Sequence, residues 1–326
     1  MNKLGKSLAV LAALGMTTAA ALAQDASVYP DRPVSLIIPY SPGGGTDILG
    51  RIVAQKLSED WGQPVVVENR PGASGLVGAK AAMQAEPDGY TLVMGSTGTL
   101  MSVATDAGVG AGDEVDVNPI LEPITMIAAP PYLLVVNPTL GVEDVEGLVA
   151  KAKEDSSSTR FGSSGVGSAS HLTGELFNSM AGTEMLHVPY KGTGPAVTDL
   201  LSGEITVMFG PAPTLLPHVE SGTLKALAVT TPKPSGLFPD YPTVDGAGVP
   251  GFASVGWFGL FAPPGTPAEL IEKINTDVQA ALTSDQVREQ LAGQGAEPDP
   301  LPVAEFTDFV ESDTAKWISL RDSVAN

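Results

Sequence analysis

The sequence predicts an α/β fold in which mostly parallel strands alternate with helices. Short apolar runs of strand length, such as Leu36–Ile38, are followed by a turn of small residues and then by an amphipathic stretch. This order occurs in similar form around residues 35–61 and again around residues 160–180. Ligands of parallel sheets lie beyond the carboxyl ends of the strands, so two such turns in different halves of the chain predict two walls of one cleft.

The first of these units is centred on residues 35–47, which read S-L-I-I-P-Y-S-P-G-G-G-T-D. Pro39–Gly45 ends the strand, and Thr46 or Asp47 is expected to cap a helix over residues 48–61 that Gly62 closes. Three glycines let the backbone turn tightly, and the first N–H groups of a helix have no partner inside it. Such a helix start attracts anions, although the turn alone is equally consistent with a simple connection.

The middle of the chain continues the alternation. Strands are expected over residues 65–67, 90–94, 133–136, 160–162, 185–188, 205–209 and 225–230. Helices are expected over residues 74–85, 142–153, 171–180, 195–201 and 214–220. Two segments are predicted to be irregular: a small polar loop at Gly95–Thr99 and a long surface loop at Leu100–Pro119, which has little periodicity.

The last third returns the chain to its first domain. Thr231–Gly251 is rich in Pro and Gly, and we interpret it as the crossing between two domains. A buried strand is expected over residues 255–262. Three helices complete the chain: one with Thr266 as N-cap and Pro267 at its first position, a short one with capping-box spacing from Thr283 to Gln286 and closed by Gly293, and a last one with an apolar stripe from Phe306 to Leu320.

The first 23 residues have the features of a secretory signal peptide. Lys3 and Lys6 precede an apolar run, and small residues end at Ala23, after which we expect cleavage. The run is too short to span a membrane, and no later run approaches the necessary length. The chain has no cysteine, so an exported protein of 326 residues must be stabilised by burial and not by disulfides. We therefore expect a periplasmic protein without stable membrane insertion, with full secretion as the alternative.

The formal charge of −20 restricts the partners. Nucleic acid and anionic membrane surfaces require clustered Lys and Arg, which this chain lacks, so neither is expected to bind. If the ligand is an anion, backbone amides and helix ends must attract it against this charge. Solubility alone also explains the acidic composition.

Enzyme signatures are missing from the sequence. The serine loops lack G-x-S-x-G, residues 72–80 resemble a phosphate-binding loop but have Ala79 in place of lysine, and no G-x-G-x-x-G follows a strand. The histidines are far apart and no cysteine joins them, so neither a metal nor a cofactor is expected. An exported hydrolase that uses Asp47 or Ser170 with His171 is the alternative, although helix caps and ligand contacts are commoner roles for such residues.

Six motifs, in order along nearly the whole mature chain, resemble the Bug (TctC-like) proteins, which are periplasmic solute-binding proteins of tripartite tricarboxylate transporters. The motifs are Y-P-D-R-P-V-S-L-I-I-P-Y-S-P-G-G-G-T-D, G-Q-P-V-V-V-E-N-R-P-G-A-S-G, P-D-G-Y-T-L-V-M-G, F-G-S-S-G-V-G-S-A-S-H-L-T-G-E-L-F, H-V-P-Y-K-G-T-G-P-A and W-F-G-L-F-A-P-P-G-T-P. Each motif alone is weak, but together they are specific.

The resemblance implies a two-lobed periplasmic binding protein of type II, a "Venus flytrap", with a carboxylate in the cleft. The signal peptide is then residues 1–23, lobe 1 is residues 24–125 and 232–326, and lobe 2 is residues 126–231. The partners it implies are a small organic carboxylate and the membrane components of a tripartite tricarboxylate-type transporter, and we expect a monomer. A ligand-loaded signal for a membrane sensor is a second use of the same fold.

The resemblance also implies ligand-binding residues. The glycine loop would contribute Tyr40, Ser41, Gly43, Gly44, Gly45, Thr46 and Asp47. The serine-rich loop would contribute Ser163, Ser164, Gly165, Gly167, Ser168, Ser170 and His171, and Ser96, Thr97 and Tyr190 would line the same cleft. The chain departs from the family at Gly210, where relatives usually carry Asp, and at Leu100–Pro119, so that ligand selectivity is expected to depend on these positions.

Overall fold

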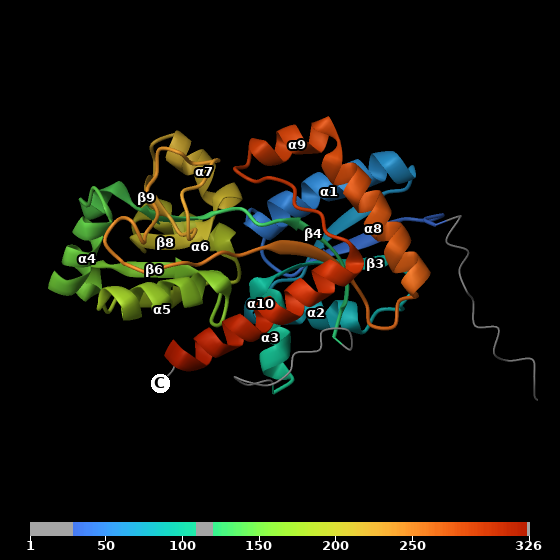
Figure 1. Cartoon of the computed structure of the whole chain (residues 1–326), viewed down its shortest axis with the longest axis horizontal. Helices are drawn as coiled ribbons and strands as arrows, with labels where there is room; N and C mark the ends of the chain where they lie inside the picture. Colours follow the sequence, from blue (N-terminus) through green and yellow to red (C-terminus); the bar gives the residue numbers. More distant parts are fainter. Residues whose placement is uncertain (1–28, 109–119, 325–326) are drawn as a thin grey trace, which may run out of the picture.

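The computed structural model describes residues 29–108 and 120–324 and consists of two α/β lobes side by side (Figure 1). The first lobe contains a sheet of order β2-β1-β3-β10-β4. Its strands are β1 (Val34–Ile38), β2 (Val65–Asn69), β3 (Thr91–Ser96), β4 (Glu122–Ala128) and β10 (Phe258–Ala262). The second sheet has the order β7-β6-β8-β5-β9 and consists of β5 (Tyr132–Val136), β6 (Arg160–Ser163), β7 (Leu186–Pro189), β8 (Val207–Pro211) and β9 (Lys225–Val229).

In each sheet four of the five strands run in the same direction, as predicted for a mostly parallel sheet, but one strand is antiparallel to both of its neighbours. In the first sheet this strand is β10, which pairs with β3 and β4, and in the second it is β5, which pairs with β8 and β9. These are the strands that follow the two crossings between the lobes. Because neither strand is joined to its neighbours by a helical crossover, each can pair with them in the antiparallel direction.

Helices cover both faces of each sheet. In the first lobe they are α1 (Gly45–Trp61), α2 (Leu76–Met83), α3 (Thr97–Asp106), α8 (Ala268–Thr283), α9 (Asp285–Ala292) and α10 (Val303–Val324). In the second lobe they are α4 (Val145–Glu154), α5 (Ala169–Ala181), α6 (Thr193–Ser202) and α7 (Ala212–Glu220), and short 3₁₀ turns occur at η2 (Ala73–Gly75), η3 (Pro138–Leu140) and η4 (Ser156–Ser158).

The strands bury side chains on both faces, because helices lie on either side. In β3, Leu92 and Met94 belong to the core under α1 and α8, whereas Val93 belongs to the core under α2, α3 and α10. In β8, Phe209 packs toward α4 and α5, and Met208 packs toward α6 and α7. The resulting three-layer lobes explain why the strands read as continuous apolar runs.

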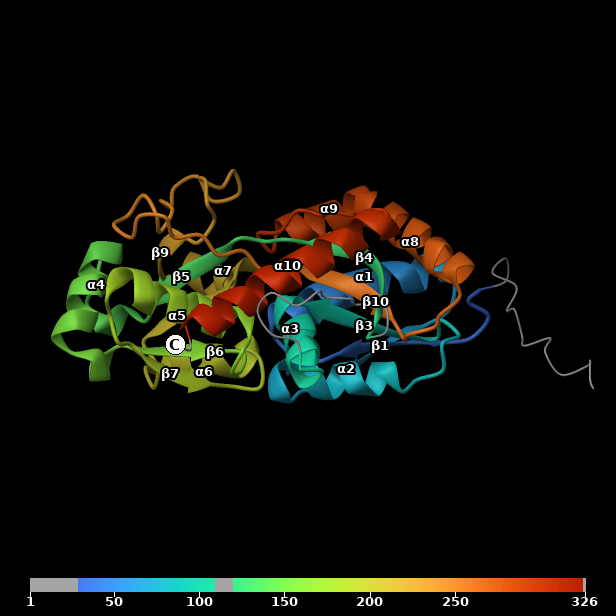
Figure 2. The same ribbon diagram turned by 60° about the horizontal axis from the view of Figure 1, so that its bottom comes forward.

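Helix α10 joins the two lobes as well as covering the first. Its early part packs in the first lobe through Phe306 and Val310. Further along, Trp317 packs with Met101 of α3 and with Ala169 and Leu172 of α5 in a small core between the lobes. Figure 2 shows the C-terminal part of α10 beside α5. The last helix therefore bridges the two lobes.

Several predicted helix N-caps are wrong by one to three residues. Gly44 is the N-cap of α1 and makes no side-chain cap, so Thr46 and Asp47 lie inside the helix. Helix α8 has Pro267 and not Thr266 as its N-cap, and Ser284 and not Thr283 caps α9 by accepting a hydrogen bond from Val287 N–H. The predicted closing glycine, Gly62, has the left-handed conformation of a C-cap.

The region after the third strand differs from the prediction. Gly95 and Ser96 belong to β3, and α3 begins at Thr97 without an intervening loop, so residues 100–106 are helical and not part of a surface loop. The Gly, Ser and Thr residues of α3 have low helix propensity, and burial of one face outweighs it. The rest of the predicted loop, residues 109–119, lies outside the described residues, as does the predicted signal peptide.

Strand β4 was not predicted from the sequence. Pro123 lies near its start, and proline argues against a strand in the interior of a sheet. The structure places β4 at the edge of its sheet, where proline is tolerated. Within residues 29–108 and 120–324, every helix is too short or too polar to cross a bilayer.

The segment from Thr231 to Gly251 packs on the second lobe before the chain returns. Val244, Val249 and Phe252 belong to the core under α4 and α5, and Val229 forms a bridge with Thr243. The bounds of the two lobes remain a prediction. Because these residues pack on the second lobe, we now place the predicted return crossing after Phe252.

Close packing of α10 on β10 leads to a stability prediction. A Cβ atom added at Gly259 would lie 2.3 Å from Cζ of the buried Phe306. Gly259→Ala should therefore lower the free energy of unfolding by about 1–3 kcal/mol, because the ring or the helix must move. Gly236→Ala, which adds a methyl group in open space, is the matched control and should change stability little. Equal urea midpoints for the two variants would contradict this packing.

Candidate functional site

Five helices begin at one place between the lobes. Helices α1 and α3 follow β1 and β3 of the first lobe, and α5, α6 and α7 follow β6, β7 and β8 of the second. Residues at all five starts line a small cavity there, which we call the cleft centre. Its lining residues are Tyr40, Gly44, Gly45, Thr46, Ser96, Gly98, Tyr132, Ser164, Ala169, Thr193, Pro211 and Phe258. The carboxyl edges of the two sheets thus face each other across the cleft.

The electrostatics of the cleft centre come from the backbone. Its lining residues include no Lys, Arg, Asp or Glu. The first N–H groups of each helix lack intrahelical partners, and the helix dipole adds partial positive charge at the same end. At α7 the Ala212 N–H already donates to the carbonyl oxygen of Pro131 and Pro213 has no N–H, so mainly the starts of α1, α3, α5 and α6 favour an anion, without a positive side chain beside it.

The lobes are closed tightly around this centre. The cavity has a volume of about 20 Å³, which is enough for about one water molecule. Backbone and side-chain groups of Ser41 donate to the carbonyl oxygen of Lys191 at 3.1 and 3.0 Å, and Ser74 Oγ donates to the carbonyl oxygen of Val166 at 2.6 Å. These contacts join the two lobes, so the lobes must separate to admit an organic ligand.

Tyr40 forms the floor of the cleft centre on the side of the first lobe. Its hydroxyl donates to the carbonyl oxygen of Ser74 at 2.9 Å and lies 3.3 Å from Ser96 Oγ and 3.4 Å from Thr99 Oγ1. Burial raises the pKa of the Tyr40 phenol, and the hydroxyl groups of Ser96 and Thr99 oppose that rise only in part. Tyr40 is therefore a neutral hydrogen-bonding group at neutral pH.

Asp47 points away from the cleft centre. Its carboxylate accepts hydrogen bonds from Gly43 N–H at 3.0 Å, from Arg51 at 3.0 Å and from Asn69 at 2.9 Å. Burial acts to raise the pKa of Asp47, but the hydrogen bonds from Arg51, Gly43 and Asn69 outweigh it and hold the pKa below its usual value. Asp47 thus supports the glycine loop from behind.

The serine-rich loop is held mainly by its own hydroxyl groups. Ser168 caps α5 by accepting from His171 N–H, and Ser170 Oγ accepts from Ser164 N–H at 2.9 Å. Ser163 Oγ is fully buried, lies 2.6 Å from His187 Nε2 and accepts from Gly165 N–H at 3.1 Å. Most of these serines therefore shape the loop, and Ser164 is the one that lines the cleft centre.

Two histidines are in contact behind this loop. The ring centres of His171 and His187 are 4.0 Å apart, and His171 Nδ1 accepts from Gly167 N–H at 3.1 Å. Burial lowers the pKa of both rings, and the nearby His171 contributes to lowering that of His187 to about 4. Both rings are therefore neutral at neutral pH. The sequence alone did not indicate that these two histidines meet.

The structure separates the predicted site residues into groups. Those at the cleft centre are Tyr40, Gly44, Gly45, Thr46, Ser96 and Ser164. A larger neighbouring cavity is lined by Gly165, Gly167, His171 and Tyr190, and an outer groove by Ser41, Gly43 and Tyr190. The residues that line none of these are Asp47, Thr97, Ser163, Ser168, Ser170 and Gly210. A Cβ at Gly210 would meet Leu215 and Met208 of the second lobe's core.

Sequence reasoning missed half of the residues that line the cleft centre, namely Gly98, Tyr132, Ala169, Thr193, Pro211 and Phe258. Thr193 and Pro211 follow strands at helix starts, so the signal that identified the first two loops would also have found them. Tyr132 and Phe258 lie at the beginnings of the two antiparallel strands, and their place at the cleft is visible only in the folded chain.

The predicted hydrolase residues do not form a catalytic pair. Ser170 Oγ is engaged by Ser164 and Ser168, His171 Nδ1 accepts from Gly167, and Asp47 binds Arg51. A nucleophilic serine requires a hydrogen bond to its base. In the described part of the chain, His, Asp and Glu side chains do not gather in any group of three that could hold a metal ion.

Two α/β lobes that enclose a cleft of helix starts define the class of periplasmic binding proteins, and known structures agree. One titled "Structure of a periplasmic transporter" has a TM-score of 0.83 and 35% identity, over 91% of this chain and 98% of the other. "R. palustris Rpa4515 with adipate" has a TM-score of 0.84 and 35% identity with the same coverage. MatC (Rpa3494) from Rhodopseudomonas palustris with bound malate has a TM-score of 0.81 and 29% identity, over 90% and 99% of the two chains.

The chain belongs to the tripartite tricarboxylate transporter family receptors, the TctC family, whose model matches residues 49–324. Among its relatives, Protein BugT of Bordetella pertussis is 36% identical over 310 residues, which are 95% of this chain and 94% of BugT. This finding confirms the family that the six sequence motifs indicated.

The contact between α6 and the glycine loop leads to a prediction about closure. A Cβ added at Gly194 would lie 2.3 Å from the carbonyl oxygen of Pro42 in the other lobe, so Gly194→Ala should hold the lobes apart. Because the chain has no cysteine, closure can be measured by disulfide formation in the variant Ser41→Cys/Lys191→Cys. Adding Gly194→Ala should slow cross-linking several-fold. Adding Gly147→Ala, in the first turn of α4, should not.

The histidine pair leads to a prediction about pH. The unfolded chain takes up a proton near pH 6.5, whereas folded His187 does so only near pH 4, so acidification favours the unfolded state. The free energy of unfolding should fall by roughly 1–2 kcal/mol from this group between about pH 7.5 and about pH 5. Urea titrations of His187→Gln should show a shallower dependence on pH than those of the wild type. An unchanged slope in His187→Gln would contradict the assignment.

Proposed function

We propose that this protein is a periplasmic receptor that captures a small organic carboxylate in the cleft and delivers it to the membrane components of a tripartite tricarboxylate-type transporter. The observation that supports it best is the meeting of five helix starts at a cavity without charged side chains. Membership of the receptor family and the adipate and malate named for two similar structures also support it. Export with cleavage after Ala23 is part of the proposal.

A carboxylate fits this cleft better than a neutral ligand does. Each helix start contributes about 0.3–1 kcal/mol to a nearby negative charge, and burial between two lobes increases that effect. The acidic surface of the protein opposes an anion at long range, but its field is screened over roughly 8–10 Å at physiological salt. The local N–H groups therefore decide the sign of the ligand's charge.

Capture would proceed by closure of the two lobes. Helix starts of both lobes line the centre, so a ligand that contacts both favours the closed arrangement. The close approach of Gly44 to Thr193 and of Gly194 to Pro42 shows how little space the closed lobes leave. A bound ligand would hold the lobes slightly further apart than these contacts do.

Ligand binding tests the first half of the proposal. The mature protein should be stabilised in thermal-shift and calorimetric titrations by small carboxylates such as malate or adipate, and not by the corresponding amides, because only the anions interact with the helix dipoles. Gly44→Val should abolish this stabilisation, since its Cβ would lie 2.6 Å from Thr193 Oγ1. Gly236→Val, in open space, is the control. Equal stabilisation by acid and amide would contradict the proposal.

Uptake tests the second half. A strain that lacks this protein should lose uptake of the identified radiolabelled acid, and wild-type protein should restore it, whereas Gly44→Val should not. Normal uptake together with a lost transcriptional response to the acid would instead indicate a ligand-loaded signal for a membrane sensor.

A further inference from the structure

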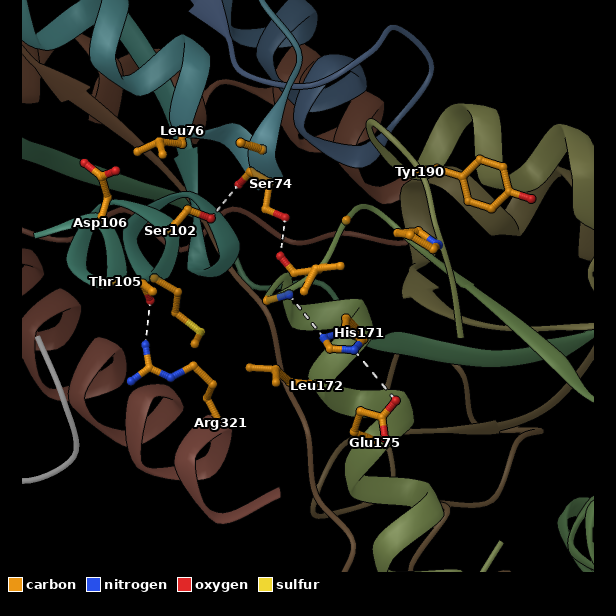
Figure 3. A pocket seen from close by; sticks show the side chains of 16 residues that line it. Ser74, Leu76, Ser102, Thr105, Asp106, His171, Leu172, Glu175, Tyr190 and Arg321 are labelled. Carbon is orange, nitrogen blue, oxygen red and sulfur yellow. Dashed lines mark hydrogen bonds and ion pairs between the residues drawn. The ribbon is translucent and has the colours of Figure 1, made fainter. Parts of the chain in front are cut away.

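A second and much larger cavity lies beside the cleft centre, and we call it the side cavity (Figure 3). Its volume is about 790 Å³, within the range of small-molecule sites. Both lobes and α10 contribute to its wall. The lining residues are Ala73, Ser74, Leu76, Met101, Ser102, Thr105, Asp106, Gly165, Val166, Gly167, His171, Leu172, Glu175, Pro189, Tyr190 and Arg321.

The side cavity continues the cleft centre along two helices. In α3, Gly98 lines the centre, and Met101 and Thr105 line the side cavity one and two turns later. In α5, Ala169 lines the centre and Leu172 lines the side cavity. From Gly98 to Thr105 the helix rises by about 10 Å. A ligand whose charged end lies at the helix starts would therefore have its body beside the second and third turns of α3.

A hydrogen bond between the two lobes lies in the wall of the side cavity. Ser74 of the first lobe donates from its hydroxyl to the carbonyl oxygen of Val166 in the second, and its own carbonyl oxygen accepts from Tyr40 at the cleft centre. Ala73 and Ser74 have positive φ angles of 45° and 52°, which is unusual for residues other than glycine. Because the Ser74–Val166 hydrogen bond joins the lobes, their separation breaks it and would open a path between the cavities.

The wall of the side cavity is largely apolar. Leu76, Met101, Val166, Leu172 and the ring of Tyr190 come from both lobes and offer surface to an apolar group.

Two of the charged side chains of the wall have charged or polar partners in the protein, whereas the third, Glu175, lies 3.7 Å from the neutral ring of His171 and disfavours a second negative charge on the ligand. Asp106 pairs with Lys80 at 2.8 Å, and Arg321 donates to Thr105 Oγ1 at 2.6 Å and to Asp322 at 2.7 Å. A ligand in this cavity therefore needs no second charge, and an apolar body would be stabilised by its removal from water.

We propose that the side cavity receives the apolar body of the bound acid, so that the ligand class is organic acids with a carboxylate joined to an aromatic ring or a hydrocarbon chain, and not short polyhydroxylated or tricarboxylic acids. This inference rests on the proposed function for the position of the carboxylate. It assigns selectivity to Leu76 and Leu172, on opposite lobes, and leaves the cleft centre to recognise the charge.

A pair of probes tests the inference with the mature protein. Butanoate and 4-phenylbutanoate have the same carboxylate and chain and differ only in the ring, so calorimetry should give at least tenfold tighter binding for 4-phenylbutanoate. Citrate should bind at least tenfold more weakly than 4-phenylbutanoate. In Leu76→Trp, the indole fills part of the side cavity, and the preference for 4-phenylbutanoate should fall to less than threefold.

The matched control is Val77→Trp, at the next residue of α2, which is 50% exposed and does not line the side cavity. It should keep the tenfold preference. If Leu76→Trp folds poorly by circular dichroism, Thr105→Trp on the exposed face of α3 replaces it with the same expected loss.

The outcomes separate the two proposals. A wild-type preference of less than threefold for the ring, tighter binding of citrate, or a preference that survives in the tryptophan variants would overturn the side-cavity inference while leaving carboxylate capture intact. If none of the three acids, malate or adipate binds, the proposed function itself fails.

Discussion

The converging starts of five helices are the constraint on which the rest of the structure depends. Each start presents N–H groups that the helix cannot satisfy, and burying several of them without a partner is unfavourable. The fold brings them together at one cavity because every one of these helices follows a strand whose carboxyl end faces the cleft. In the proposed function an anionic ligand that bridges the lobes would satisfy them, so the same groups that attract the ligand would also favour closure.

The surroundings of the cleft fit this role. The glycine loop is held from behind by the carboxylate of Asp47, which Arg51 and Asn69 fix in turn, so negative charge is kept out of the cleft centre. Small residues permit the approach of the lobes, since a methyl group at Gly194 would collide with the backbone at Pro42. In the proposed function, charge recognition and closure therefore depend on backbone positions, whereas the side cavity presents apolar side chains such as Leu76 and Leu172.

The sequence predicted best those secondary-structure elements whose signals come from residues close together in the chain. The strand at Leu36–Ile38 and the helix that follows it were predictable because apolar spacing and the closing Gly62 are local. Helix α3 was missed because burial between α2 and α10, and not its own propensity, makes Thr97–Asp106 helical. The edge strand β4 was missed because Pro123 is compatible with a strand only at the edge of a sheet, and the sequence does not show that β4 lies there.

For the candidate site, the sequence by itself determined the family, the alternation of strands and helices, and the two loops of small residues, because those features are written in short contiguous motifs. Only the tertiary structure decided that Tyr132 and Phe258 join them, that Asp47 and Ser170 turn away, and that His171 contacts His187. The physical reason is that a cleft between two lobes is formed by residues far apart in the chain, whose meeting depends on how each strand enters its sheet and on how closely the backbones pack.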